Sequence, residues 1–270
     1  MSYVLEAESE FERLERQSKH PSFNYQHELR ELFLPPGGVV LDAGSGSGVV
    51  CRYLADTYPK AKVVGCDISD QRIALAQKAA KNLKNVSFQK ENITALTFED
   101  QTFDAVVCRY VLQHLDDTAR IAAIREFERV LKPGGQIYLV DTDALLTTLY
   151  PQTPLVATTL SQFVENGPVD FYVGRKLPSL LAEAGFEKIN WLVDITTCTG
   201  EFADAEIQMM RERFENANSF FVQILGSAEK AAAFAKEYID AMASPGGVYY
   251  QNKFVVSGYK SARAKLKLVD

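Results

Sequence analysis

The sequence has 270 residues, of which 47% are hydrophobic and 24% are charged, and its formal net charge is −6. This length and balance predict one large globular domain, residues 1–270, with a sizeable core. The negative charge argues against a nonspecific grip on nucleic acid, and the apolar runs are too short to span a bilayer. The acidic N-terminus lacks the pattern of a secretory signal and the four cysteines lie far apart, so we expect a cytoplasmic protein with reduced thiols.

Residues 1–36 are predicted to form an N-terminal helical cap, and residues 37–142 alternate between strand and helix patterns. Strand patterns cover 39–44, 61–67, 85–90, 103–109 and 136–143, and helix patterns cover 49–59, 69–83 and 117–131. This alternation indicates βαβ units, and the continuous apolar runs suit parallel strands that are buried on both faces. We therefore predict an α/β fold with a doubly wound sheet, whose ligand lies at the carboxyl ends of the strands near the switch point.

Residues 143–270 are predicted to complete the same domain. A helix that ends at Gly185 is followed by a sixth strand, and residues 248–260 have the pattern of a seventh. Two long inserts, at about 144–172 and 200–245, interrupt this half, and the second has amphipathic helical patterns. Connections of that length inside a compact domain are usually functional. We expect the two inserts to cover a pocket for a small organic substrate.

An unusual loop directly follows the first strand, where the chain reads VVLDAGSGSG from residue 39 to 48. Three glycines this close together indicate a tight turn or a ligand pressed against the backbone. The NAD fingerprint G-x-G-x-x-G needs a third glycine, but Val49 or Cys51 stands at that position, depending on the starting glycine. Asp42 favours a ligand with a positive charge or amine donors near this loop. The alternative, that Asp42 only caps the turn, stays open.

Further polar residues follow the other strands in order. Asp67 ends the second strand, where its carboxylate could accept from both hydroxyls of a ribose, and Ile68 beside it could lie flat on a purine. Asn92 follows the third strand, where its amide could recognise the edge of an adenine. The fourth strand ends at Arg109, and the turn LKPGG precedes the fifth.

At these residues the chain resembles the class I S-adenosylmethionine-dependent methyltransferases, specifically the small-molecule group that includes the ubiquinone and menaquinone methylases. The resemblance covers residues 37–142 and is thin beyond them. It implies a Rossmann-like, seven-stranded, mostly parallel sheet with helices on both faces, an N-terminal helical lid and helical insertions in the C-terminal half. Many relatives have Asp where this chain has Asn92, which leaves the strength of that contact open.

The resemblance also implies a cofactor, S-adenosyl-L-methionine, and roles for individual residues. The loop at Gly44, Ser45 and Gly46 would approach the methionine part, with Asp42 organising the loop or meeting the methionine amine. Asp67 would hold the ribose beside Ile68, Asn92 and the backbone of Ile93 would hold the adenine, and the carbonyl of Arg109 would meet the amine. Similar enzymes often begin with a Tyr followed by E-x-x-R-L-x-x-Q, in a helix that closes over the cofactor. Here the matching residues are Tyr3, Arg13 and Gln17.

The expected reaction is transfer of a methyl group to a small organic acceptor by in-line displacement, with catalysis mainly by positioning. A base is needed only if the acceptor must lose a proton, and His114, just beyond the fourth strand, is the candidate; a packing or capping role for it stays open. No spacing of His and carboxylates predicts a metal site. Two other functions remain, an NAD(P)-dependent oxidoreductase and a non-catalytic S-adenosylmethionine-binding module. The acceptor atom and the oligomeric state are not predicted.

Overall fold

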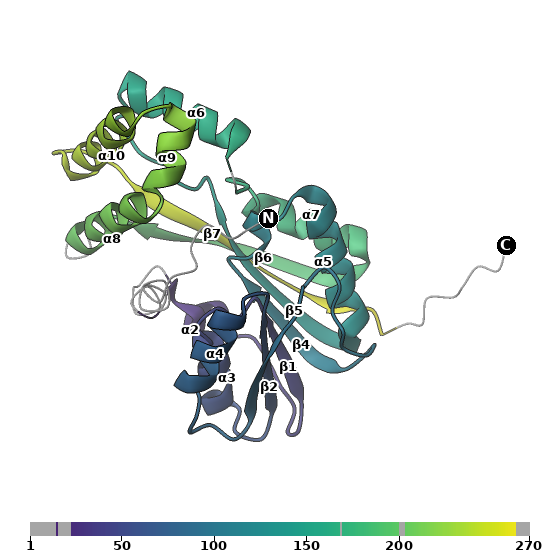
Figure 1. Ribbon diagram of the computed structural model, residues 1–270. Helices are drawn as coiled ribbons and strands as arrows, with labels where there is room; N and C mark the ends of the chain where they lie inside the picture. The colour runs from purple at the N-terminus through teal and green to yellow at the C-terminus, as the bar shows by residue number, and fades with distance from the viewer. Residues whose placement is uncertain (1–14, 16–22, 168, 200–202, 263–270) are drawn as a thin grey trace.

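The computed structural model describes residues 15, 23–167, 169–199 and 203–262. Its centre is a seven-stranded sheet with the order β3-β2-β1-β4-β5-β7-β6 (Figure 1). Neighbouring strands from β3 to β5 are parallel, whereas β7 is antiparallel to both β5 and β6. The strands are β1 (Val39–Ala43), β2 (Lys62–Asp67), β3 (Val86–Lys90), β4 (Phe103–Arg109), β5 (Leu131–Asp143), β6 (Phe186–Thr197) and β7 (Tyr250–Lys260). The predicted mostly parallel, seven-stranded sheet is confirmed.

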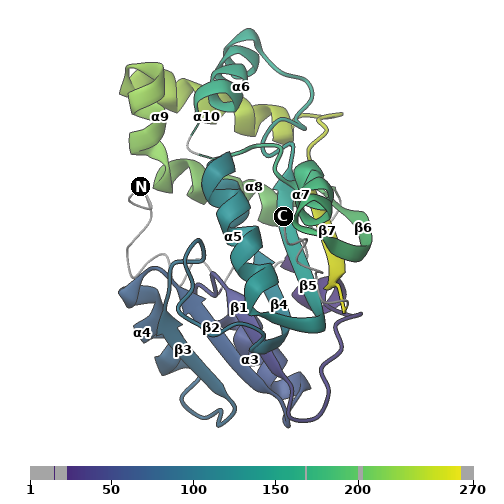
Figure 2. The same ribbon diagram turned by 90° about the vertical axis from the view of Figure 1, so that its right-hand side faces the viewer.

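Helices cover both faces of this sheet (Figure 2). On one face α3 (Val49–Thr57) and α4 (Asp70–Ala79) pack against β1, β2 and β4, next to the short α2 (Tyr25–Glu28). On the other face of the sheet lie α5 (Asp117–Val130) and α7 (Leu177–Ala184), and α7 packs against β6 and β7. The chain crosses from one half of the sheet to the other between β1 and β4, so the switch point lies where these two strands end.

Local sequence signals account for most of the boundaries. The Ser69 side chain caps α4 by accepting from the amide of Arg72 at 3.4 Å, and Gly185 ends α7 with a φ of 88°, a conformation that glycine adopts without strain. The turn LKPGG behaves differently from the prediction. It lies inside β5, which begins at Leu131 opposite Phe103 and resumes regular pairing at Gln136 opposite Ala105. The extra residues form an irregularity of the strand rather than a loop before it.

The two inserts form a helical cluster with an apolar core of its own. It consists of α6 (Pro154–Asn166), α8 (Ala203–Asn216), α9 (Asn218–Leu225) and α10 (Ala228–Ala243). Phe163 lies at its centre, with its ring centroid 4.9 Å from that of Phe221 and 5.6 Å from that of Phe234. This cluster, the helical insert, stands beyond the carboxyl end of β5 (Figure 1), because both inserts leave the sheet at that edge. Two short 3-10 helices, η2 (Leu112–His114) and η3 (Gly174–Lys176), complete the described elements.

Candidate functional site

The glycine loop after β1 has the conformation that its sequence demands. Gly44, Gly46 and Gly48 have φ values of 81°, 52° and 73°, a region that side-chain-bearing residues rarely occupy. The amides of Gly44 and Ser45 both donate to the carbonyl of Cys66 at 2.8 Å, which fastens the loop to the end of β2. A Cβ atom on Gly44 would lie 2.3 Å from Cγ2 of Val111, so this residue, two positions after the end of β4, also leaves no room for a side chain there. The loop is therefore held tightly between β2 and the segment that follows β4.

Two carboxylates flank this loop, and both are almost completely buried. Asp42 is 3% exposed and Asp67 is 5% exposed. Asp67 accepts from the amides of Gly46 and Ser69, each at 3.0 Å, so it ties the glycine loop to the start of α4. Asp42 accepts from the thiol of Cys51 at 3.1 Å, and burial raises its pKa to about 6. The predicted residues at the ends of β1 and β2 thus lie side by side around the loop.

The residues predicted to surround an adenine lie at the ends of β2 and β3. Ile68 is 60% exposed, which leaves a large apolar side chain in solvent directly after Asp67. Ile93 is buried, whereas Asn92 is exposed. The Asn92 side-chain oxygen accepts from the amide of Thr94 at 3.0 Å and from its hydroxyl at 2.9 Å. The side-chain oxygen of Asn92 is therefore engaged locally, and its predicted contact with the edge of an adenine stays a prediction.

Arg109 ends β4, but its side chain turns away from the glycine loop into a buried ion-pair network. Its Nε donates to Oε2 of Glu28 at 2.6 Å. Lys253 on β7 contacts the other oxygen of Glu28 at 2.7 Å and reaches Asp194 on β6 at 3.1 Å. Burial lowers the pKa of Arg109, but Glu28 together with Tyr110 and Asp42 more than offsets this effect, and the net shift is upward. The side chain of Arg109 is thus paired with Glu28, and the predicted role of its carbonyl toward a ligand amine stays a prediction.

The segment after β4 is held in place by two buried charged side chains that the sequence analysis did not identify. Asp141, at 1% exposed, accepts from the amides of Gln113 at 3.1 Å and Thr142 at 2.9 Å. Arg120 in α5 donates to the carbonyls of Leu112 at 3.2 Å and Leu115 at 2.7 Å. Arg120 thus donates to two carbonyls of this segment and Asp141 accepts from one of its amides. These hydrogen bonds fix the segment that follows β4. The contact between Asp141 and Gln113 joins residues 28 positions apart, and no local pattern in the sequence predicts it.

His114, the candidate base, ends η2 within this segment. Burial and then the positive charge of Arg72 lower its pKa to about 4, so the imidazole is neutral at physiological pH. A neutral imidazole can accept a proton, but this low pKa makes it a weak base. The same burial suits the packing role that the sequence analysis left open.

The remaining predicted residues, Tyr3, Arg13 and Gln17, lie outside the described residues. Glu15, between the last two, is described, and its carboxylate accepts twice from Nη2 of Arg52 on α3, at 2.7 and 2.9 Å. Across the described ranges, no group of three His, Cys, Asp or Glu side chains is arranged to hold a metal ion. No helix within those ranges is long and apolar enough to cross a membrane.

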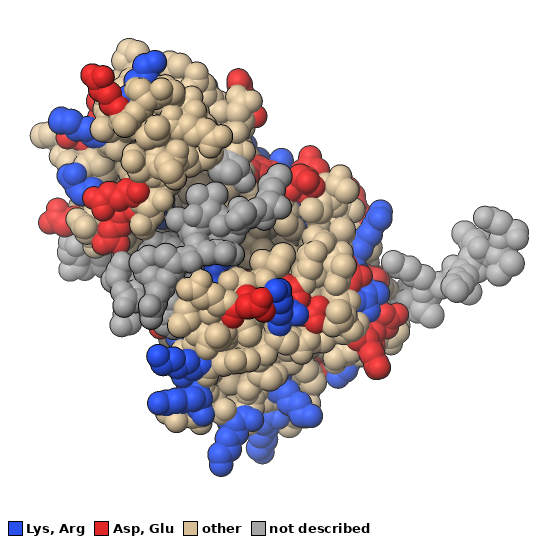
Figure 3. Space-filling view, viewed as in Figure 1, with Lys and Arg blue, Asp and Glu red and all other residues tan. Residues whose placement is uncertain are grey.

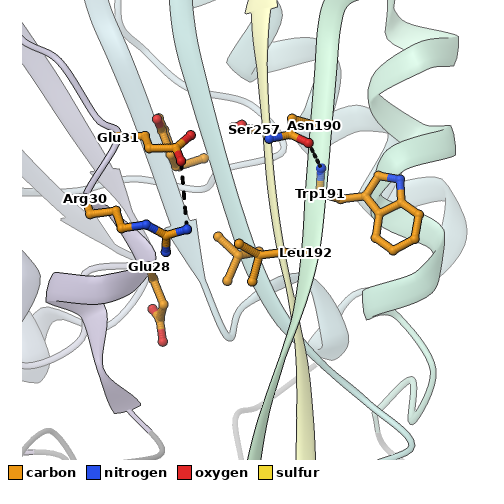
Figure 4. A pocket seen from close by; sticks show the side chains of 9 residues that line it. Glu28, Arg30, Glu31, Asn190, Trp191, Leu192 and Ser257 are labelled. Atoms are coloured by element: carbon orange, nitrogen blue, oxygen red, sulfur yellow. Dashed lines mark hydrogen bonds and ion pairs between the residues drawn. The ribbon is translucent and has the colours of Figure 1, made fainter.

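A small hollow lies elsewhere, on the sheet face next to α2 (Figure 4). Side chains from α2 and its following turn meet β5, β6 and β7 there, and Arg30 lies 3.8 Å from Glu31 at its rim. The Trp191 side chain points away from it. No residue at the carboxyl end of β1, β2 or β4 lines this hollow, so it is separate from the glycine loop. Its only link to those strands among the described residues is Glu28 of α2, which lines the hollow and also pairs with Arg109.

Comparisons with known proteins agree with this geometry. Residues 40–135 match a family model described as a methyltransferase domain. An uncharacterized 37.1 kDa protein from a Streptomyces fradiae transposon is 32% identical over 184 residues, which cover 66% of this chain and 50% of that protein. A ubiquinone/menaquinone biosynthesis C-methyltransferase of Desulfotalea psychrophila is 28% identical over 172 residues, which cover 58% of this chain and 69% of that one. The chain thus spans only half the length of the first of these relatives.

The fold is also found among solved structures. Phosphoethanolamine N-methyltransferase 2 of Haemonchus contortus, solved with phosphomonomethylethanolamine and S-adenosylhomocysteine, aligns with a TM-score of 0.61 and 19% identity. The alignment covers 94% of this chain and 58% of that one, and at this identity it shows the shared fold alone. Residues 40–135 thus match a methyltransferase domain, and the strand order, with the glycine loop at the switch point, is that of the Rossmann-like fold of class I methyltransferases.

Proposed function

We propose that the whole chain transfers a methyl group from S-adenosylmethionine to a small organic acceptor. The observation that carries this proposal is the switch point itself, where three glycines with positive φ lie beside the buried carboxylates of Asp42 and Asp67. Two details fit a nucleoside-containing ligand at this edge. The hydroxyl of Ser45 is buried without a hydrogen-bond partner among the described residues, and Ile68 leaves its apolar side chain exposed next to Asp67.

The residues that would hold the cofactor follow from these positions. Asp67 would accept from the ribose hydroxyls, Ile68 would cover one face of the adenine, and Asn92 would meet its edge. The glycine loop would lie against the methionine part, whose amine would meet Asp42 and the carbonyl of Arg109. S-adenosylmethionine supplies a methyl group that a sulfonium already activates. The protein therefore needs chiefly to orient the acceptor along the axis of displacement, which is catalysis by positioning.

A small acceptor suits the surroundings of this edge better than a nucleic acid. The helical insert stands beyond the carboxyl end of β5, where it could enclose a small molecule. On the face in Figure 3 acidic and basic side chains are interspersed, and although several basic ones lie along the lower margin, others lie on the insert at the top beside acidic ones, so no continuous basic surface is seen on this face. A net charge of −6 also disfavours a polyanionic substrate. The pKa of His114 is lowered to about 4, so this residue would be a weak base. The site therefore suits an acceptor that is already nucleophilic better than one that must lose a proton.

The alternative of an NAD(P)-dependent oxidoreductase is disfavoured by Cys51. This residue stands where one reading of the dinucleotide fingerprint needs its third glycine, and its thiol is committed to Asp42. A dinucleotide pyrophosphate would also be repelled by a carboxylate at that loop.

The decisive experiment is incubation of the protein with methyl-labelled S-adenosylmethionine and a metabolite extract, followed by identification of the labelled product. Calorimetric titrations with S-adenosylhomocysteine and with NADH run in parallel. We expect binding of S-adenosylhomocysteine and a labelled small molecule. Tight NADH binding alone would refute the proposal in favour of an oxidoreductase, and cofactor binding without any labelled product would refute it in favour of a binding module.

A further inference from the structure

The side chain of Asp42 is supported by Cys51, through both its thiol and its backbone amide, and the thiol makes the larger contribution. Oδ2 of Asp42 accepts from the thiol of Cys51 at 3.1 Å, and both residues are buried in the layer between β1 and α3. Burial raises the pKa of Cys51 well above its ordinary value, so the thiol keeps its proton and can donate. The bond therefore links the first turn of α3 to the carboxylate beside the glycine loop.

The fold makes room for this thiol by omitting a side chain on the neighbouring strand. Gly65 in β2 faces the thiol, and a Cβ atom there would lie 2.7 Å from Sγ of Cys51 and 2.5 Å from Cδ1 of Phe88. The thiol is thus held in a closed position between strand and helix, where it cannot turn freely to another acceptor. Packing of this kind restricts the direction of the hydrogen bond from the Cys51 thiol to Asp42.

Charged groups around Asp42 act on its ionisation in opposite directions. Arg109 on β4 stabilises the carboxylate, whereas Asp67 on β2 opposes it. The thiols of Cys66 on β2 and Cys108 on β4 also lie close enough for their ionised forms to interact with Asp42. Because Arg109 is already paired with Glu28, it is not committed to Asp42 alone. Burial raises the pKa of Asp42 to about 6, and the bond from Cys51 counteracts part of that rise.

We propose that Cys51 is a positioning residue, whose thiol holds the carboxylate of Asp42 ionised and oriented toward the amine-bearing part of the cofactor. The choice of ligand rests on the proposed function, but the link between the two side chains does not. A thiol is a weak donor. It therefore supports the charge only partially, and cofactor binding becomes sensitive to pH just below neutrality.

The direct test is the titration of Asp42 in the protein without ligand, followed by ¹³C NMR of the aspartate carboxyl carbons and assigned with the variant Asp42→Asn. We expect Cys51→Ala to raise the midpoint by about 0.5 pH unit, the size of one weak hydrogen bond. Cys51→Ser, which keeps a donor, should return the midpoint to the wild-type value or below. Cys108→Ala is the matched control, since this thiol is equally buried and also near Asp42 but is not bonded to it.

The functional readout is the affinity for S-adenosylhomocysteine measured by calorimetry from pH 5 to pH 8. Cys51→Ala should bind about threefold more weakly than the wild type at pH 5 and equally at pH 8, as a shift of that size requires. An unchanged midpoint in Cys51→Ala, an equal shift in Cys108→Ala or a failure of serine to rescue would overturn the proposal. If the wild type does not bind S-adenosylhomocysteine at all, the proposed function fails, while the carboxyl titration still tests the link between Cys51 and Asp42.

Discussion

Replacing Gly44 by alanine tests how tightly the glycine loop is held against the segment after β4. The φ of 81° costs a side-chain-bearing residue roughly 1–2 kcal/mol. The new methyl group would also lie 2.3 Å from Cγ2 of Val111, and overpacking of this kind costs about 1–3 kcal/mol. We therefore expect Gly44→Ala to lower the free energy of unfolding by about 2–5 kcal/mol in urea titrations, and to weaken the binding of S-adenosylhomocysteine.

Gly246 provides a matched control, because its φ is also 81° but an added Cβ atom would have nothing within 4 Å. Gly246→Ala should therefore show the cost of the backbone conformation alone. Val111→Ala removes the clashing methyl groups, so Gly44→Ala should cost less in that background, with a coupling energy of about 1–3 kcal/mol. Equal destabilisation by Gly44→Ala and Gly246→Ala, together with no coupling to Val111, would refute the reasoning that the loop is packed against this segment.

Three further predictions concern the carboxylates and the helical insert. Asp67→Ala should weaken S-adenosylhomocysteine binding by about 1.5–3 kcal/mol in calorimetry and also destabilise the fold, because two main-chain amides lose their acceptor; unchanged affinity in a folded variant would contradict the ribose assignment. Burial raises the pKa of Asp42 to about 6 and that of Asp141 to about 7, so between roughly pH 4 and pH 7 the folded chain binds protons that the unfolded chain has released. Their contribution to the free energy of unfolding should fall as the pH rises through this window, by about 3 kcal/mol for Asp42 and about 4 kcal/mol for Asp141. Replacing both by asparagine should remove that fall from the pH profile, and an identical profile would contradict this expectation. Phe163→Ala should destabilise the helical insert by about 3–5 kcal/mol and accelerate amide exchange in α6 and α8–α10 more than in the sheet, whereas uniform acceleration would mean that the insert and the sheet unfold together.

Much of the fold could be predicted because its determinants are local. The apolar runs of β1 and β4, the cap at Ser69 and the stop at Gly185 each depend on residues within one turn or strand, and all four occur as expected. The fifth strand starts earlier than predicted, at Leu131 rather than after LKPGG, and its start depends on a distant part of the chain. Its first residue pairs with Phe103 across the sheet, and pairing with another strand cannot be read from the turn itself.

The candidate site divides in the same way. The residues at the strand ends could be predicted, because the carboxyl ends of parallel strands meet at one edge whatever the rest of the chain does. The side chains that support them could not. Glu28 and Lys253 come from opposite ends of the chain, and Glu28 pairs with both Arg109 and Lys253 only because folding brings α2 against β4 and β7.

The sequence by itself thus determined the sheet, the glycine loop and the order of polar residues along one edge, since periodicity and backbone preference act over a few residues. Only the tertiary structure decided which atoms of those residues are free. The side chain of Arg109 is taken up by Glu28, and the carboxylate of Asp42 accepts from Cys51 beside the bare backbone of Gly65. Hydrogen bonding and burial in a closed space depend on neighbours that folding assembles, so the charge and direction of each group are settled by packing rather than by the local chain.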